Sequence, residues 1–322
     1  MLRFDHQVVL ITGAGRGIGR QHALFFASRG AKVVVNDYGG GLRGENGHNP
    51  APADQVVAEI RAAGGTAMAA CCDIGDGPQV QAMIDSAIGQ FGRLDVLVHN
   101  ASVYAPLGSF ADARAEDLER ILRVNVLGGW HVAHAAWRQM LAQGYGRIVM
   151  TGSGAGFFGR RKDQAYSIAK SALMGFTKVL ATEGAKLGIK VNLVGPVAWT
   201  DASRDQGMPF IMARFAPPIF ITNLVAVLAH ECCPVNGEMF HCGGGFVARV
   251  FVGETPGAVF DAEATTPEAV LAGMDRIMAA EDYTIPPNSD RSGAHLSAAI
   301  AAVNPAFARL LAEAKQGRQQ RD

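Results

Sequence analysis

The chain has 322 residues, of which 49% are hydrophobic and 18% charged, so it can build a large core and is not globally disordered. Its 29 basic and 29 acidic residues balance, which excludes the long-range positive field typical of nucleic-acid-binding proteins. The N-terminus lacks an export signal and no later apolar run looks long enough to cross a membrane, so we expect a cytoplasmic protein that binds no membrane.

Six short runs rich in β-branched residues predict buried strands, and longer stretches with helical spacing separate them. The runs are QVVLIT (7–12), KVVVN (32–36), TAMAAC (66–71), LDVLVHN (94–100), GRIVMT (146–151) and IKVNLV (189–194). This alternation predicts an α/β fold, a Rossmann-type doubly wound parallel sheet with helices on both faces. The Gly- and Pro-rich residues 39–53 predict a loop after the second strand.

The turn after the first strand, TGAGRGIGR, contains Gly13, Gly17 and Gly19, and a helical pattern follows at once. Glycines at this spacing allow a tight turn and let backbone N–H groups approach a pyrophosphate at a helix N-terminus. A glycine turn without a ligand is the alternative interpretation. The strand–turn–helix context favours a dinucleotide site.

Asp37 follows the second strand, where a carboxylate binds the adenosine ribose hydroxyls in such folds. A carboxylate there repels a 2′-phosphate, which favours NAD over NADP. Arg16, inside the glycine turn, is the counter-argument, because a guanidinium could hold that phosphate. We give Asp37 more weight, since it acts directly at the 2′ position.

Tyr166 and Lys170 are four residues apart in QAYSIAKSALMGF, so they are neighbours on one helix face. A nearby ammonium in a partly dry cleft favours the phenolate and would lower the tyrosine pKa, which fits Tyr166 as a general base for an alcohol proton. A solvated lysine beside a helix-face tyrosine is the alternative for this pair alone. Ser153 follows the fifth strand and Asn100 ends the fourth, both at the edge where parallel sheets bind ligands.

Together these motifs resemble the short-chain dehydrogenase/reductase superfamily over roughly residues 5–245. The resemblance implies an NAD(P)-dependent enzyme acting on CH–OH groups, with the catalytic residues Asn125, Ser153, Tyr166 and Lys170. It implies adenine contacts at Asp73 and Ile74. It places the remaining cofactor contacts at Gly13, Arg16, Gly17, Ile18, Gly19, Asp37, Asn100, Ala101, Tyr166, Lys170, Pro196, Val197 and Thr200.

By the same resemblance, Lys170 binds the nicotinamide ribose and Asn125 holds a water molecule that links Lys170 to solvent. Two positions depart from the family pattern. Ser102 replaces a glycine close to the cofactor ribose, and Val197 replaces the glycine that follows the proline of the sixth strand. The second change removes a flexible residue beside the nicotinamide.

A narrower resemblance is to the (3R)-hydroxyacyl-CoA dehydrogenase unit of peroxisomal multifunctional enzyme type 2, carried by VVVNDYGG, YGRIVMTGSGAG and HECCPVNGEMFHCGGGFVARV. It implies oxidation of a small-molecule substrate, a (3R)-3-hydroxyacyl-CoA, with NAD. It also implies a homodimer, with a tetramer as the alternative. We expect a stand-alone protein of bacterial type, in which residues 1–250 form the catalytic and cofactor-binding domain and residues 251–322 form a C-terminal extension.

Two other functions stay open. The catalytic residues fit a hydroxysteroid or other secondary-alcohol dehydrogenase equally well. A non-catalytic cofactor-binding sensor is the alternative from another class, and the intact Asn–Ser–Tyr–Lys set argues against it, because a pure binder needs no Tyr–Lys pair.

The residues after Gly245 are too apolar for a solvated tail. We expect them to pack over the substrate side of the cleft, or in a dimer interface. The apolar residues in question are Phe246, Val247, Val250, Phe251, Val252, Val259 and Phe260, together with Met208, Phe210, Ile211, Met212 and Phe215 of the loop after the sixth strand.

The five cysteines form no obvious disulfide framework, and the odd count favours reduced thiols. The stretch HECCPVNGEMFHC contains ligand-type residues, but it lacks the paired C-x-x-C spacing of common zinc sites. We therefore predict buried thiols here and no metal site.

Overall fold

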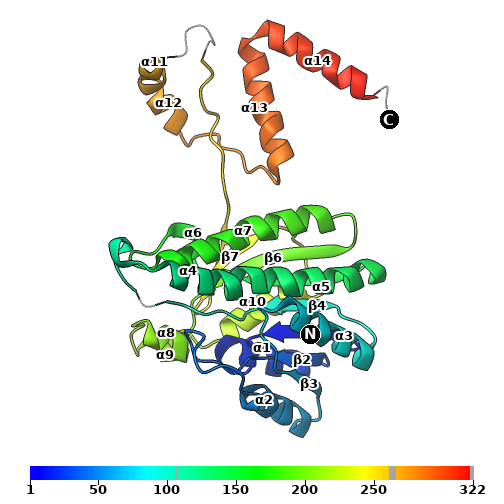
Figure 1. Ribbon diagram of the computed structural model, residues 1–322. Coiled ribbons are helices and arrows are strands. Elements are labelled where there is room, and N and C mark those ends of the chain that lie inside the picture. The colour runs from blue at the N-terminus through cyan, green and yellow to red at the C-terminus, as the bar shows by residue number, and fades with distance from the viewer. Residues whose placement is uncertain (106, 261–265, 320–322) are drawn as a thin grey trace. The chain divides into compact units, whose positions relative to one another are not determined.

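Eight strands form one sheet within the described part of this computed structural model, residues 1–105, 107–260 and 266–319. Their order is β3-β2-β1-β4-β5-β6-β7-β8. Figure 1 labels β3, β2, β4, β6 and β7 of this sheet. The strands are β1 (Val8–Thr12), β2 (Lys32–Asn36), β3 (Thr66–Ala70), β4 (Val96–His99), β5 (Gly146–Thr151), β6 (Ile189–Pro196), β7 (Met239–Gly243) and β8 (Phe246–Val250). All neighbouring pairs are parallel except β7 and β8. The predicted doubly wound fold class is confirmed.

Helices cover both faces of the sheet because its strands are apolar on both sides. The helices α1 (Gly17–Ser28), α2 (Ala51–Ala62) and α10 (Ile219–Ala229) share one core cluster with Val9 and Ile11 of β1. The helices α3 (Gly77–Phe91), α5 (Gly128–Gln143) and α7 (Gln164–Gly184) share the other cluster with Val8 and Leu10. Successive side chains of β1 therefore enter opposite layers, as the pleat requires.

Shorter helical elements connect these layers at the ligand-binding edge of the sheet. They are η1 (Phe110–Asp112), α4 (Ala115–Leu122), the π-helical segment η2 (Arg123–Leu127), α6 (Gly154–Phe158), α8 (Asp201–Asp205) and α9 (Met212–Phe215). The predicted loop 39–53 is shorter than expected, because α2 already begins at Ala51. Proline is favourable in the first turn of a helix, and Pro52 occupies that position.

The sheet extends two strands further than the sequence analysis predicted. Strand β7 continues the parallel order, and β8 turns back antiparallel through Gly244 and Gly245, whose φ angles are 57° and 86°. Phe246, Val247 and Val250 therefore belong to an edge strand. Pairing with β7 fixes their backbone but not what their side chains cover, so the expectation that they cover the substrate side of the cleft stays a prediction.

The chain divides into two compact units, Met1–Val250 and Phe251–Asp322. The second unit contains α11 (Pro267–Ala272), α12 (Met274–Met278), α13 (Ser289–Val303) and α14 (Pro305–Gln319). Within it, Phe251 stacks on Tyr283 with ring centroids 5.6 Å apart, and Glu254 pairs with Thr284 in an antiparallel bridge.

Among the described residues, the stretch Met212–Ala229 is long and apolar enough to cross a membrane, by length and composition alone. Its mean hydropathy is 1.5, and 39% of it is buried. The expectation that no apolar run reaches that length is therefore wrong. Residues 216–218 separate the stretch into α9 and α10. Ile221, Val225 and Leu228 of α10 pack in the core, which accounts for much of its apolar composition.

Asp95, a fully buried carboxylate at the start of β4, ties two strands together. Its Oδ2 accepts hydrogen bonds from the Val8 N–H and from Arg93 Nε, both at 2.8 Å. Its Oδ1 accepts from an Arg93 Nη at 2.6 Å. Each oxygen of the buried carboxylate therefore accepts at least one hydrogen bond from a residue at or just before the start of β1 or β4.

We expect Asp95→Ala to lower the free energy of unfolding by about 2–4 kcal/mol, because a buried N–H and a guanidinium lose their partner. Urea unfolding followed by circular dichroism measures the loss. Asp85→Ala is the matched control, since exposed Asp85 bonds only Gln81 of the same helix. Equal losses in the two variants would contradict a special role for Asp95.

Candidate active site

A cavity of about 770 Å³ lies at the carboxyl edge of the parallel strands. Residues that directly follow β1, β2, β4, β5 and β6 line it. Of the site residues predicted from the sequence, it brings together Gly13, Arg16, Gly17, Ile18, Asp37, Asp73, Ile74, Asn100, Ala101, Ser153, Tyr166, Lys170, Pro196, Val197 and Thr200. Gly19 and Asn125 are not in its wall.

The glycine turn has no room for side chains at Gly13 and Gly19, and its backbone forms one end of the cavity. A Cβ on Gly13 would lie 2.7 Å from the Cα of Ala101, and Gly13 has a φ of 63°. A Cβ on Gly19 would lie 2.2 Å from the Gly13 carbonyl oxygen. Gly19 therefore packs beneath the turn and holds the start of α1 close to it. This cradle fits a dinucleotide pyrophosphate at the α1 N-terminus.

Asp37 is held rigidly at the end of β2. Its Oδ2 accepts from the Gly15 N–H and its Oδ1 from the Gly39 N–H, both at 2.8 Å. Arg16 also lines the cavity, and one of its Nη atoms donates to the Gly40 carbonyl at 2.8 Å. The carboxylate is therefore fixed on the cavity wall, and the guanidinium is engaged by the loop after β2.

Two further residues mark the dinucleotide end of the cavity. Asp73 accepts from the Gly75 N–H at 2.9 Å and pairs with Arg123 at 2.7 Å, which fixes its carboxylate beside Ile74. Asn100 donates to the Thr12 and Gly13 carbonyls at 3.1 and 3.0 Å. Asn100 thereby ties the end of β4 to the glycine turn.

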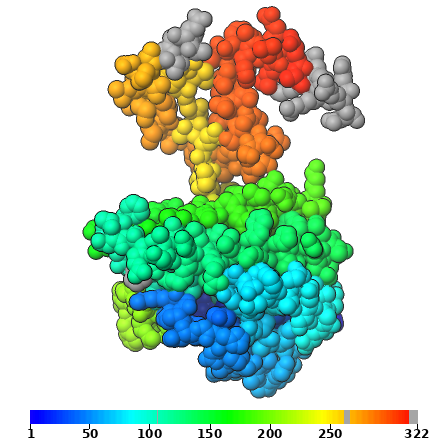
Figure 2. Space-filling view, in the orientation of Figure 1, coloured from blue at the N-terminus to red at the C-terminus, as the bar shows by residue number. Residues whose placement is uncertain are grey.

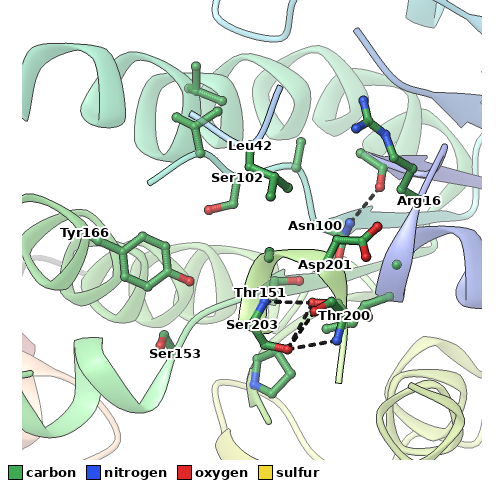
Figure 3. A pocket seen from close by; sticks show the side chains of 18 of the residues that line it. Arg16, Leu42, Asn100, Ser102, Thr151, Ser153, Tyr166, Thr200, Asp201 and Ser203 are labelled. Atoms are coloured by element: carbon green, nitrogen blue, oxygen red, sulfur yellow. Dashed lines mark hydrogen bonds between the residues drawn. The ribbon is translucent and has the colours of Figure 1, made fainter. Parts of the chain in front are cut away.

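Tyr166 and Ser153 lie together at the other end of the cavity, away from Arg16 and Asn100 (Figure 3). Ser153 caps α6, and its Oγ accepts from the Ala155 N–H at 3.1 Å. Burial raises the pKa of the Tyr166 phenol above its ordinary value, and hydrogen bonding with Ser153 partly opposes this. The expected lowering of the Tyr166 pKa is thus wrong for the protein by itself, because desolvation outweighs the hydrogen bonding with Ser153 and Ser102.

Lys170 lies about one turn after Tyr166 on α7 and is 1% exposed. Its Nζ donates to the Thr151 carbonyl at 2.7 Å and sits 5.5 Å from the centre of the Tyr166 ring. Burial lowers the Lys170 pKa to about 7. The amine can therefore gain or lose a proton near neutral pH, unlike an ordinary lysine.

Thr151, whose carbonyl accepts from Lys170, also lines the cavity. Its Oγ1 is buried and has no hydrogen-bond partner among the described residues, although Thr151 lines the cavity. Buried hydroxyls without a partner are rare, and one in a cavity wall is suited to a bound ligand. Together with the glycine cradle and fixed Asp37, this hydroxyl supports a fit for a nicotinamide dinucleotide.

Asn125 supports the site from behind. Its side chain accepts from the Val103 N–H at 2.8 Å and donates to the Val103 carbonyl at 2.9 Å. Its backbone carbonyl, part of π-helical η2, is 3.1 Å from His99 Nε2, and His99 Nδ1 is 3.3 Å from the Thr12 hydroxyl. Burial lowers the His99 pKa to about 4, with Lys170 contributing, so this histidine is neutral. The chain of contacts fixes the ends of β1 and β4 against η2.

Loops close the rim of the cavity on two sides. Thr200 caps α8 through a reciprocal pair with Ser203, in which Thr200 N donates to Ser203 Oγ at 2.8 Å (Figure 3). The loop after β2 lies against α8 (Figure 2), where Arg43 is 3.7 Å from Asp205. The Tyr104 hydroxyl also donates to Asp205. Three segments distant in sequence thus meet at one carboxylate.

Several aromatic side chains lie close together near the end of the cavity that contains Tyr166. His241 of β7 lines the cavity, and its ring centre lies 6.2 Å from that of Phe158 and 6.4 Å from that of Phe246. Phe158 and Phe246 are 70% and 60% exposed and lie outside the cavity wall, so they add apolar surface beside His241. Met208, from the loop after α8, also lines the cavity.

The sequence analysis assigned no site role to several residues that the structure places here. Gly15 positions Asp37 and belongs to the glycine motif itself, which is the signal that could have identified it. Thr151 ends a predicted strand at the ligand edge. His241 carried no usable signal, because its approach to the cavity depends on long-range packing. Ser102, which the sequence analysis placed close to the cofactor ribose, also lines the cavity.

The HECCPVNGEMFHC stretch does not assemble a metal site in the described part of the chain. No group of three or more His, Cys, Asp or Glu side chains there is placed to hold an ion. All five cysteines are free thiols, and burial raises the pKa of Cys242 to about 12. His230 instead bonds the Arg3 carbonyl at 3.1 Å.

Comparison with known families agrees with this geometry. The family model described as short chain dehydrogenase matches residues 7–206. A peroxisomal hydratase-dehydrogenase-epimerase from Neurospora crassa is 40% identical over 278 residues, which is 86% of this chain but 30% of the relative. The chain thus spans less than a third of that relative's length. A putative short-chain type dehydrogenase/reductase from Mycobacterium tuberculosis is 39% identical over 79% of this chain and 88% of its own.

Solved structures show the same likeness. Full-length peroxisomal multifunctional enzyme type 2 from Drosophila melanogaster superposes with a TM-score of 0.78 at 29% identity, covering 94% of this chain and 51% of that one. A 7 alpha-hydroxysteroid dehydrogenase in complex with NADH and 7-oxo glycochenodeoxycholic acid has a TM-score of 0.67 at 31% identity, over 76% and 95% of the two chains.

We expect Lys170 to make stability rise with pH above neutrality. The folded protein releases this proton near pH 7, whereas an unfolded chain keeps it to about pH 10.4, so the cost of the buried charge disappears as pH rises through this window. Urea unfolding at pH 7.5 and 9 should show a gain of roughly 1 kcal/mol per pH unit relative to Lys170→Met. Parallel curves for the two proteins would show that Lys170 titrates normally.

Proposed function

The chain belongs to the short chain dehydrogenase family, and on that premise we propose that it oxidises a (3R)-3-hydroxyacyl-CoA to the 3-ketone with NAD. The proposal rests on one cavity that contains both parts of such a site. The glycine cradle lies at one end, and Tyr166, Ser153 and buried Lys170 lie at the other. An alcohol bound at Tyr166 would lie in the same cavity as the dinucleotide.

The residues divide the proton chemistry among them. Ser153 would hold the substrate hydroxyl against the Tyr166 oxygen. Once ionised to the phenolate, Tyr166 would accept the hydroxyl proton while the hydride leaves the same carbon for the nicotinamide. When bound, the nicotinamide dinucleotide supplies the hydride acceptor. Lys170 in its cationic form favours the phenolate, and its lowered pKa of about 7 lets it pass a proton on near neutral pH.

Two contacts support NAD as the cofactor. Two backbone N–H groups fix Asp37 where the ribose hydroxyls would bind, so its negative charge would repel a 2′-phosphate. Arg16, the cation that could offset this repulsion, donates to the Gly40 carbonyl instead.

The hydroxyacyl-CoA class rests on the relatives and on the substrate end of the cavity. The relatives include a protein named peroxisomal hydratase-dehydrogenase-epimerase and one named peroxisomal multifunctional enzyme type 2. Exposed rings at Phe158 and Phe246, beside His241, offer an apolar surface for an acyl chain. Burying each methylene of such a chain is worth about 0.8 kcal/mol.

A hydroxysteroid is the second candidate substrate. The likeness to a 7 alpha-hydroxysteroid dehydrogenase supports it, and the same aromatic surface would suit a ring system. The proton chemistry at Tyr166 is identical for both substrates, so it does not separate them.

We also propose a homodimer. Large apolar side chains remain exposed on helices α5 and α7, where a symmetric partner could bury them. They are Trp130 and Leu141 of α5, and Ile168 and Val179 of α7.

We expect the purified protein to form NADH, read at its absorbance, with (3R)-3-hydroxyacyl-CoA thioesters and with little activity on the (3S) forms. Tyr166→Phe should lower kcat by about 10²–10⁴-fold while dinucleotide binding persists, because the general base is lost. A variant that keeps more than about a tenth of wild-type kcat would contradict the role of Tyr166. Activity on steroid alcohols alone would favour the second candidate, and cofactor binding without any turnover would indicate a sensor.

We expect Asp37→Ser to shift the ratio of kcat/KM for NAD over NADP toward NADP by about tenfold or more, since the charge facing a 2′-phosphate disappears. Steady-state kinetics with both cofactors measure the ratio. Asp54→Ser, a change of the same size on the nearby α2, is the control. A wild-type preference for NADP would overturn the assignment of Asp37.

A further inference from the structure

The connection between α6 and α7 carries three consecutive cations, Arg160, Arg161 and Lys162. The whole chain has equal numbers of basic and acidic residues, so this run is a local concentration of positive charge. Arg160 lines the cavity that contains Tyr166, whereas Arg161 and Lys162 are exposed. We call residues 160–162 the cation loop.

The cation loop is fixed in place by contacts on two sides. Lys162 has a φ of 68°, a left-handed conformation that costs energy for a side-chain-bearing residue. Its carbonyl accepts from the Gly108 N–H at 2.9 Å, and the Gln164 side chain donates to the Gly108 carbonyl at 2.9 Å. On the other side, an Arg160 Nη donates to Gln206 Oε1 at 2.6 Å.

Few carboxylates neutralise these cations. Asp163 is 3.7 Å from Arg160, but it is itself 5% exposed and burial raises its pKa. On the facing helix α8, Asp201 pairs with Arg204 at 2.8 Å, and Asp205 lies 3.7 Å from Arg43. In the described part of the chain, Arg161 and Lys162 form no ion pair. Two cationic side chains at the rim are thus free to meet an anion.

We propose that the cation loop binds the phosphate groups of the coenzyme A portion of the substrate. The inference rests on the proposed function and extends it to a second part of the same ligand. The reacting carbon must lie at Tyr166, and the pantetheine arm separates it from the phosphates, so the phosphates fall beyond the cavity rim. Arg160 is in the cavity wall, and the next two residues, Arg161 and Lys162, are exposed outside it, where phosphates beyond the rim could reach them.

The chemistry of the loop suits phosphate. Guanidinium groups bind phosphate oxygens through paired N–H donors, and an ammonium adds a mobile point charge. Because the Gly108 and Gln206 contacts hold the loop before any ligand arrives, little ordering is needed on binding.

The test compares two thioesters of the same (3R)-3-hydroxy acid, one on coenzyme A and one on N-acetylcysteamine, which lacks phosphates. In Arg161→Gln/Lys162→Gln we expect KM for the coenzyme A thioester to rise about tenfold, with kcat within about twofold of wild type. KM for the N-acetylcysteamine thioester should stay unchanged. Raising the salt concentration should increase the wild-type KM for the coenzyme A thioester alone.

Arg138→Gln/Lys186→Gln is the matched control, because Arg138 on α5 and Lys186 in the turn after α7 are exposed outside the cavity wall and the pair removes the same charge. It should leave both KM values unchanged. Equal effects of the loop variant on both thioesters, or no effect on either, would overturn the cation loop assignment while thioester oxidation itself stands. A wild type that oxidises neither thioester would instead contradict the proposed function. A KM increase confined to a carboxylate-bearing steroid alcohol would assign the loop to that anion and reject coenzyme A.

Discussion

The register of the parallel sheet is the constraint on which the site depends. Pairs such as Thr12 with Asn36 and Thr151 with Val194 bring the carboxyl ends of neighbouring strands to one edge. The next residues along the chain are therefore neighbours in space, although they are far apart in sequence. A slip of one residue in any strand would turn these side chains to the other face, so core packing and site geometry are enforced together.

Desolvation sets the resting state of the proton chemistry. Burial pushes Tyr166 and Lys170 toward their neutral forms, the phenol by raising its pKa and the amine by lowering its pKa to about 7. A neutral pair avoids two buried charges, whose cost a single ion pair seldom repays. The proposed base is thus not charged in advance. Its activation depends on what occupies the cavity and on the hydrogen bond with Ser153.

Long-range contacts give this enzyme its individual features. Asp205 contacts Arg43 of the loop after β2 and accepts a hydrogen bond from Tyr104 of the segment after β4, so it joins the two segments. Burial and the hydrogen bond to Asp205 raise the pKa of Tyr104 to about 12. At the other end, the antiparallel turn through Gly244 and Gly245 sets Phe246 beside His241. The first group shapes the rim on the dinucleotide side and the second shapes the rim on the substrate side.

The sequence by itself determined the parts that obey local rules. Apolar runs gave six of the strands, glycine spacing located the turn at Gly13, and the i,i+4 spacing of Tyr166 and Lys170 placed both on one helix face. The sequence did not predict β8, because Gly244 and Gly245 suggest the end of the domain. Strand β8 forms only because β7 provides an edge with which it pairs. The direction of the Tyr166 pKa shift likewise required the tertiary structure, since desolvation depends on which distant segments cover the phenol.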